Sequence, residues 1–185
     1  MDENNKKIKF QKTKYIASYL VLFYTTHMQK RILGIDPGFD RTGFGIVDMK
    51  GSDAIWVHHE CVQTHPADTF SARLQTVRDR LQNVLTLYTP THVAVEQLFF
   101  QTNAKTAMKV GMARGVILLT LADAKLPIIE MTPNQVKQGI AGWGRADKKQ
   151  VQQMVQMLLK LKSKPTPDDA SDALAIAIVG GLMAR

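Results

Sequence analysis

The stretch Arg31–Asp48, RILGIDPGFDRTGFGIVD, contains an apolar run that ends abruptly on an acid. The residues Ile32–Ile35 have the pattern of a buried strand, and Asp36 follows them directly. A Pro-Gly pair then precedes a second alternating run, 42–47. A buried carboxylate without a partner costs several kcal/mol and is normally neutralised. We therefore expect Asp36 either to accept hydrogen bonds from backbone donors of the turn or to meet a cation.

The composition is that of an ordinary globular domain with a basic character. The chain has 185 residues, of which 45% are hydrophobic and 22% charged, which is enough for about one domain with a sizeable core. Its net charge of +8 favours polyanionic partners, nucleic acid above all. The single cysteine, Cys61, excludes an intramolecular disulfide and fits a reducing, cytoplasmic location.

Residues 1–27 differ from the rest of the chain. They carry five lysines ahead of an apolar run, 15–24, which is shorter than the roughly 20 residues that a membrane span needs. The start imitates a signal peptide, but no small-residue cleavage site follows. We predict that 1–27 is an upstream extension or a mis-set start outside the fold, and that 28–185 is one domain. Removing the five lysines and two acids of 1–27 leaves 19 basic and 14 acidic residues, a net charge of +5.

After Met28 the sequence predicts three strands and then alternating helices and strands. The strands at 31–36, about 42–48 and about 54–62 alternate like an antiparallel meander with a glycine-containing turn. Helical spacing and short apolar runs predict the other elements: helices at about 69–87, 103–124, 133–140, 147–161 and 168–183, and strands at 92–96 and 126–131. This order predicts an α/β fold with one mixed sheet and helices on both of its faces.

Acids recur where the chain leaves buried elements. The predicted strand HVAVE ends on Glu96, which either belongs to a site or simply reaches solvent. In PDDASDALAIAI, Asp169 and Asp172 lie three residues apart and therefore on one helical face. Asp168 has the position of an ordinary helix cap, whereas Asp172 lies too far into the helix to cap it.

A group of such carboxylates would need a bound cation. The helix dipole contributes only about 0.3–1 kcal/mol, too little to offset the desolvation of several acids together. Oxygen ligands without thiolate or imidazole favour Mg²⁺ or Mn²⁺, and on a basic protein they are typical of phosphoryl transfer by two metal ions. Because the metal-free acids would repel each other, replacing Asp169 or Asp172 by Asn is expected to raise the melting temperature of the metal-free protein.

Four motifs occur in one order between Met28 and about Gly181: GIDPG…TG.G, VEQLFF, QVKQ…G.G.ADKKQV and PDDASDALAIA. Together they resemble the RuvC-type Holliday-junction resolvases of the ribonuclease H-like superfamily. The resemblance implies a ribonuclease H-like mixed five-stranded sheet flanked by helices on both faces. It also implies an Mg²⁺-dependent endodeoxyribonuclease, with two ions per site, that resolves four-way DNA junctions in recombination and repair by paired nicks.

The resemblance implies partners besides the four-way junction. Members of this family act as homodimers and work with a branch-migration motor complex. A candidate dimer surface is the predicted helix 103–124, with the apolar residues Met108, Met112, Val116 and Leu119.

The family's four acidic positions fall on Asp36, Glu96, Asp169 and Asp172, which implies that these residues are catalytic and hold the metal ions. Some members carry histidine at the third position, where this chain keeps aspartate. Asp168 is an extra acid beside it, but Asp169 preserves the three-residue step to Asp172.

By motif, the basic residues near the cut phosphate are Lys137 and Lys148, with both catalytic and DNA-binding roles. An ammonium group there would neutralise charge that develops during the cut. Lys149 is the competing assignment to Lys148, and the alternative for it is a solvated helix face.

Phe99 matches a family aromatic that contacts bases at the junction, and stacking on an unpaired base contributes about 1–3 kcal/mol. Either Phe99 or Phe100 is expected in the core instead, because adjacent strand residues face opposite ways. On the next helix, Lys105, Lys109 and Arg114 either follow phosphates or face water, and we assign Lys105 to DNA binding.

Three alternatives compete with a junction resolvase. The opening motif also resembles the phosphate loop of actin-like ATPases and sugar kinases, but those need a second lobe for which 185 residues leave no room. A ribonuclease H-like nuclease could act on another nucleic acid, such as an RNA–DNA hybrid or the end of an RNA precursor. A non-catalytic junction-binding module could keep the fold without the chemistry, although the presence of all four acids argues against it.

Overall fold

The computed structural model describes residues 30–98 and 104–184, and the predicted extension 1–27 lies outside them. The strands are β1 Lys30–Asp36, β2 Arg41–Lys50, β3 Asp53–Gln63, β4 His92–Glu96 and β5 Ile128–Met131. The helices are α2 Phe70–Tyr88, α3 Ala104–Asp123, α4 Pro133–Ala141, α5 Lys148–Leu158 and α6 Asp168–Met183. Each predicted element is present in its predicted place, and the ends differ by at most a few residues.

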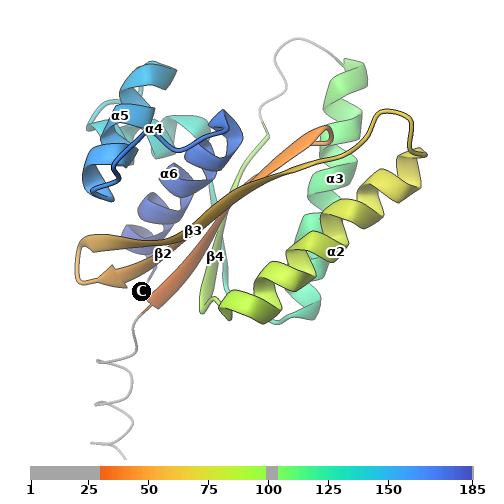
Figure 1. The fold of residues 1–185 in the computed structure, drawn as a ribbon, viewed down its shortest axis with the longest axis horizontal. Coiled ribbons are helices and arrows are strands. Elements are labelled where there is room, and N and C mark those ends of the chain that lie inside the picture. The colour runs from red at the N-terminus through yellow and green to blue at the C-terminus, as the bar shows by residue number, and fades with distance from the viewer. Residues whose placement is uncertain (1–29, 99–103, 185) are drawn as a thin grey trace, which may run out of the picture.

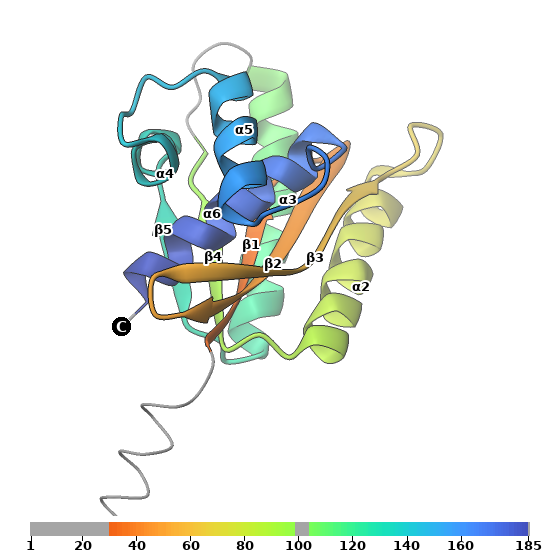
Figure 2. The same ribbon diagram turned by 60° about the vertical axis from the view of Figure 1, so that its left-hand side comes forward.

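The strands form one mixed five-stranded sheet in the order β3-β2-β1-β4-β5. The pairs β1–β2 and β2–β3 are antiparallel, whereas β1–β4 and β4–β5 are parallel. Helices α2 and α3 cover one face, and α4, α5 and α6 cover the other (Figures 1 and 2). The predicted α/β architecture with helices on both faces of a mixed sheet is therefore confirmed.

The alternation of side chains along β1 decides which way Asp36 points. Leu33 and Ile35 belong to the hydrophobic core under α2 and α3, whereas Ile32 belongs to the core under α6. A Cβ atom at Gly34 would meet the backbone of α6. Because successive side chains of a strand face opposite sides of the sheet, Asp36 faces α6.

Strand β4 repeats this arrangement beside β1. Ala94 packs in the core under α6, so Glu96, two residues later, faces the same side. The parallel register pairs Ile35 with Val95, which leaves Asp36 and Glu96 at the same level on neighbouring strand ends. The sheet alone therefore brings these two acids together.

Glycines let α6 lie directly on the backbone of β1 and β2. A Cβ atom at Gly34, Gly43 or Gly45 would lie 2.1, 2.0 or 2.5 Å from a backbone atom of α6, which is closer than real Cβ atoms approach. The glycines of the opening motif thus bring a helix onto the sheet. Asp169 and Asp172 on that helix are carried to the ends of β1 and β4 as a result.

Capping boxes fix where the helices beside α6 begin. Thr132 and Gln135 cap α4, with Pro133 in its first turn as predicted. Asp147 and Gln150 exchange the same pair of side-chain-to-backbone bonds at the start of α5. Lys148 is therefore the first residue of α5.

The described part of the chain begins and ends at one corner of the molecule. The Lys30 ammonium group donates to the Ala184 carbonyl oxygen at 2.8 Å. Within the segments 30–98 and 104–184, no helix is both long and apolar enough to cross a membrane.

Candidate active site

Asp36 and Glu96, here called the strand-end pair, both have raised pKa values. Burial first, and then the charges of neighbouring acids led by Glu96, together raise the pKa of Asp36 to about 8. Burial likewise raises the pKa of Glu96 to about 7, with a contribution from Asp172. Within the described segments no hydrogen bond or ion pair reaches the Asp36 carboxyl. Among the described residues no backbone donor of the turn caps Asp36, and the raised pKa favours its protonated form in the metal-free protein.

Asp169 and Asp172, here called the helix pair, meet basic side chains from other elements. The Arg41 guanidinium lies 2.8 Å from Asp169 Oδ2. The Lys148 ammonium lies 3.3 Å from Asp172 Oδ2. Burial raises the pKa of Asp172, and the Lys148 charge only partly opposes that rise. The two acids of α6 are thus held by cations while the strand-end pair is not.

Asp168 does not cap α6, so that expectation is wrong. Pro167 occupies the cap position, and Asp168 is the first helical residue. Its carboxylate accepts from Gln152 Nε2 at 2.8 Å and lies 3.3 Å from Lys148 Nζ. These contacts lower the pKa of Asp168. Asp169, not Asp168, contributes to the raised pKa of Asp36, which favours Asp169 as the member of the acidic group.

A cleft of about 220 Å³ opens between the strand ends and the helices α4, α5 and α6. Its charged lining consists of Glu96, Lys137, Lys148 and Asp172, and its remaining lining is Pro133, Val136, Val151, Ala175 and Ile176. The Lys137 charge partly opposes the rise in the pKa of Glu96. Lys149 is exposed and does not line this cleft, so the geometry favours Lys148 over its neighbour.

Two residues near the helix pair were not anticipated from the sequence. Arg41 stands at the start of β2, and the Cys61 thiol on β3 donates to Asp169 Oδ2 at 3.8 Å. Burial raises the pKa of Cys61, so the thiol is neutral at pH 7 and can donate. Gly43, which lies against α6, pairs with Cys61 across the β2–β3 ladder. The position of Cys61 opposite Gly43 is what places it at the site, and this position can be recognised only once the β2–β3 register is known.

Two other basic residues of α3, Arg114 and Lys109, make different contacts within the protein. Arg114 does not simply face water: it pairs with Glu130, and its Nε donates to the Glu96 carbonyl oxygen at 3.4 Å. Lys109 Nζ lies 5.7 Å from the centre of the Phe39 ring. Phe99, Phe100 and the side chain of Lys105 lie outside the described residues.

The donor set fits a hard divalent cation, provided that the helix pair turns. Four carboxylates from β1, β4 and α6 supply oxygen ligands of the kind that Mg²⁺ or Mn²⁺ prefers. As they stand, however, no three His, Cys, Asp or Glu side chains of segments 30–98 and 104–184 are placed to hold an ion. Asp169 and Asp172 are instead turned to Arg41 and Lys148.

A mixed five-stranded sheet with acids at the ends of β1 and β4, and further acids on a helix packed across them, defines a ribonuclease H-like nuclease. The family model described as crossover junction endodeoxyribonuclease RuvC matches residues 32–180. The chain therefore belongs to the RuvC family of crossover junction endodeoxyribonucleases.

Individual relatives agree with this membership. The crossover junction endodeoxyribonuclease RuvC of Heliobacterium modesticaldum is 50% identical over 147 residues, which cover 80% of this chain and 91% of the relative. The Thermus thermophilus RuvC solved in complex with a Holliday junction substrate is 39% identical, with a TM-score of 0.80 over 84% of this chain and 95% of the other. A yeast mitochondrial Holliday junction resolvase, 13% identical with a TM-score of 0.61, shares the fold.

Proposed function

We propose that this chain resolves Holliday junctions by hydrolysing phosphodiester bonds in two opposed DNA strands during recombination and repair. The observation that carries the proposal is the cleft in which two carboxylates, Glu96 and Asp172, face two ammonium groups, Lys137 and Lys148. It is supported by the 39% identity to a RuvC that was solved with a Holliday junction substrate. The net charge of +8 suits a DNA substrate.

The four acids are proposed as the ligands of two Mg²⁺ ions, which Mn²⁺ can replace. When bound, such ions supply an activated water nucleophile and stabilise the leaving oxygen. The backbone register of β1 and β4 fixes the strand-end pair, and the glycine-lined seat of α6 brings the helix pair to it. Since carboxylate ligands must be ionised, Asp36 has to lose its proton as it becomes a ligand.

The two lysines are proposed to act on the phosphate that is cut. Lys148 begins α5 and Lys137 is on α4, so two short helices each contribute an ammonium group to the cleft that Glu96 and Asp172 also line. An ammonium group there neutralises negative charge as it develops on the phosphate oxygens. Lys148 is also free to leave Asp172 when a metal ion takes that carboxylate.

Recognition of the junction is proposed to involve Phe99, by stacking on an unpaired base, and Lys105, by contact with a phosphate. In the sequence, Phe99 comes three residues and Lys105 nine residues after Glu96, which lines the cleft. This nearness in the chain supports the two assignments.

The proposed functional unit is a homodimer, because two opposed strands require two sites. The surface of α3 supports a dimer: the apolar side chains Met108, Met112 and Leu119 are 64%, 48% and 64% exposed. Exposed apolar side chains aligned on one helix mark an interaction surface. The family resemblance supports a branch-migration motor complex as a further partner and action in the cytoplasm, with residues 1–27 outside the catalytic domain 28–185.

The test is digestion of an immobile four-way junction with and without Mg²⁺. We expect paired nicks on opposed strands with the wild-type chain in Mg²⁺, and none in EDTA or with Asp36→Asn. An RNA–DNA hybrid serves as the substrate control and should remain uncut. Cutting of the hybrid in preference to the junction, or junction binding without any nicking in Mg²⁺ or Mn²⁺, would contradict the proposal.

A further inference from the structure

Arg41, the first residue of β2, is a basic side chain beside the acidic group. Its guanidinium lies 2.8 Å from Asp169 Oδ2, and the Cys61 thiol donates to the same oxygen at 3.8 Å. Arg41 is on β2 and Cys61 is on β3, so two strands of the sheet hold one carboxylate oxygen of α6. The opposite side of the acidic group has only the looser contact of 3.3 Å between Lys148 and Asp172.

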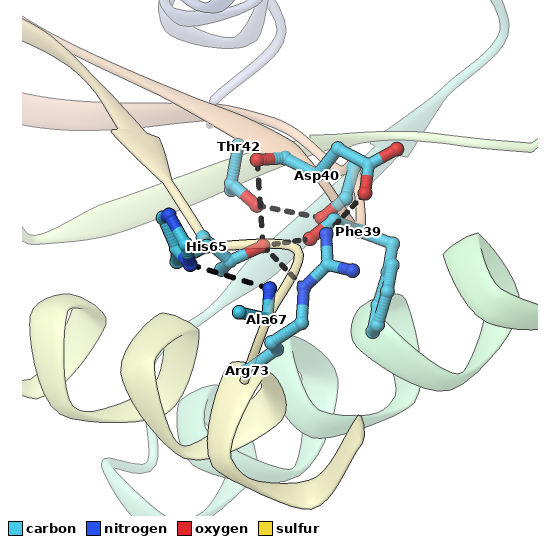
Figure 3. Close-up of polar contacts among 8 residues, drawn as sticks. Phe39, Asp40, Thr42, His65, Ala67 and Arg73 are labelled. Carbon is cyan, nitrogen blue, oxygen red and sulfur yellow. Dashed lines mark hydrogen bonds and ion pairs between the residues drawn. The ribbon is translucent and has the colours of Figure 1, made fainter. Parts of the chain in front are cut away.

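The turn that carries Arg41 is anchored on the side away from the acids. Arg73, from α2, is almost completely buried; it pairs with the Asp40 carboxylate and donates from Nε to Thr64 Oγ1 at 2.8 Å. Its guanidinium also lies 4.0 Å above the Phe39 ring. The Thr64 amide completes the arrangement by donating to the Asp40 carbonyl oxygen at 3.0 Å. Figure 3 shows Arg73 reaching into this turn at Phe39 and Asp40.

This anchoring fixes the backbone next to Arg41, so that its side chain starts from a defined place beside α6. About 44% of the Arg41 side chain is exposed, whereas 26% of the Asp169 side chain is. The guanidinium can therefore swing toward solvent, which leaves the Asp169 carboxylate free to turn toward an ion. The two partners of this ion pair are unequal in freedom, and Arg41 is the one that can leave.

The guanidinium and a divalent ion compete for the same oxygen. Mg²⁺ binds carboxylate oxygens at about 2.0–2.1 Å, and an oxygen already engaged by a guanidinium would bring two cations together. We propose that Arg41 is a positioning residue that holds Asp169 in the metal-free protein and releases it to the divalent ion, and thereby sets the affinity of the site for metal. The inference rests on the proposed function, because it requires Asp169 to be a metal ligand.

The direct test measures metal binding without DNA. The melting temperature of the full chain is followed against the concentration of Mg²⁺, and separately of Mn²⁺, and the dissociation constant is obtained from the stabilisation. Because an ion pair of this exposure is weak, Arg41→Gln should bind the ion roughly two- to five-fold more tightly than wild type. Arg41→Lys keeps the positive charge on a shorter side chain, so its dissociation constant for the ion should lie between those of wild type and Arg41→Gln.

Arg78→Gln is the matched control. It removes one positive charge on α2, where Arg78 pairs with the adjacent Asp79 on the other side of the sheet. It should leave the dissociation constant unchanged. If it tightened metal binding as much as Arg41→Gln does, general charge would explain the effect and the inference would be overturned.

A second measurement separates positioning from damage to the fold. In junction cutting, Arg41→Gln should reach half of its maximal rate at a proportionally lower Mg²⁺ concentration, with the maximal rate retained. Equal dissociation constants for wild type and Arg41→Gln, with clear metal binding by both, would overturn this inference alone. If neither ion stabilised the wild-type chain, the metal-dependent part of the proposed function would fail and the inference with it.

Discussion

The strand-end pair and the helix pair are neutralised by different means in the metal-free protein. Asp36 and Glu96 are fixed side by side by the parallel register of β1 and β4, and burial raises the pKa of Asp36 to about 8 and that of Glu96 to about 7. Asp169 and Asp172 lie on a helix, and each meets a basic side chain from another element. In the proposed metal site, the ions would therefore displace protons from one pair and side-chain cations from the other.

This difference assigns the two pairs separate tasks. The strand-end pair is placed by backbone hydrogen bonds, so its geometry is available before metal arrives. The helix pair has side chains that must turn away from Arg41 and Lys148. The proposed metal site would thus combine a pair fixed by the backbone with a pair whose side chains have to move.

The largest effect is expected when any ligand is removed, whichever pair it belongs to. Asp36→Asn, Glu96→Gln and Asp172→Asn should each lower the rate of junction cutting by more than about a hundredfold, since even groups behind a metal ligand are worth 10–100-fold. Junction binding should be retained, because each change preserves shape and removes a negative charge. Rates at saturating protein and gel-shift affinities measure the two properties. Near wild-type cutting by one variant would remove that residue from the ligand set.

The next effect concerns stability and separates the two pairs. Asp36 has its pKa raised to about 8 in the folded protein, against about 3.9 in an unfolded chain. The unfolded chain therefore ionises first, and the free energy of unfolding of metal-free wild type falls as pH rises from about 4 to about 8, by up to about 1.4 kcal/mol per pKa unit. Asp36→Asn removes this loss. Urea denaturation in EDTA from about pH 5 to about pH 9 should show the stability advantage of Asp36→Asn growing up to about pH 8 and then levelling off.

Asp169→Asn is the contrasting variant in the same measurement. It relieves repulsion but also breaks the pair with Arg41, which is worth about 0–1 kcal/mol at this exposure. The change in unfolding free energy should therefore stay within about 1 kcal/mol at all pH values. This differs from the expectation drawn from sequence, in which Asn at either helix acid raises the melting temperature. A larger gain with Asp169→Asn than with Asp36→Asn would reverse the comparison.

The smallest expected effect concerns the cation that faces the helix pair from α5. Lys148→Ala should reduce the slope of log affinity against log salt by about one unit if the ammonium contacts a phosphate. It should also slow cutting at saturating protein. Lys149→Ala, on the exposed side of the same helix, should do neither. If Lys149→Ala impaired cutting and Lys148→Ala did not, the lysine that acts on the phosphate would be Lys149 instead of Lys148.

Much of the fold followed from the sequence because its signals are local. Alternation identified β1 to β3, helical spacing identified α2 and α6, and Thr132-Pro133 marked the start of α4. The family prediction was also confirmed, since four motifs in a fixed order are a far more specific signal than GIDPG alone. The same alternation explains why an acid two residues after a glycine that faces α6 also points toward that helix.

The missed features depend on which residues meet across elements. Arg41 and Cys61 both reach Asp169 because of the register in which β2 and β3 pair. That register also contains an irregularity between Ile46 and Val47. Asp168 was expected to cap α6, but a cap needs the residue before the helix, and a proline occupies that place. Sequence patterns identify elements, whereas such contacts depend on their three-dimensional packing.

The contact between Lys30 and Ala184 has a practical consequence for experiments on this protein. Lys30 begins β1 and Asp36 ends it, so six steps of about 3.3 Å put that corner roughly 20 Å from the strand-end pair. Handles joined before residue 30 or after residue 184 would leave from one place, far from the cleft. A surface tether joined at residue 30 or residue 184 would leave the cleft facing away from the surface. Two fluorophores, one on each handle, would lie close enough for energy transfer between them. A third fluorophore could then be placed on the junction DNA.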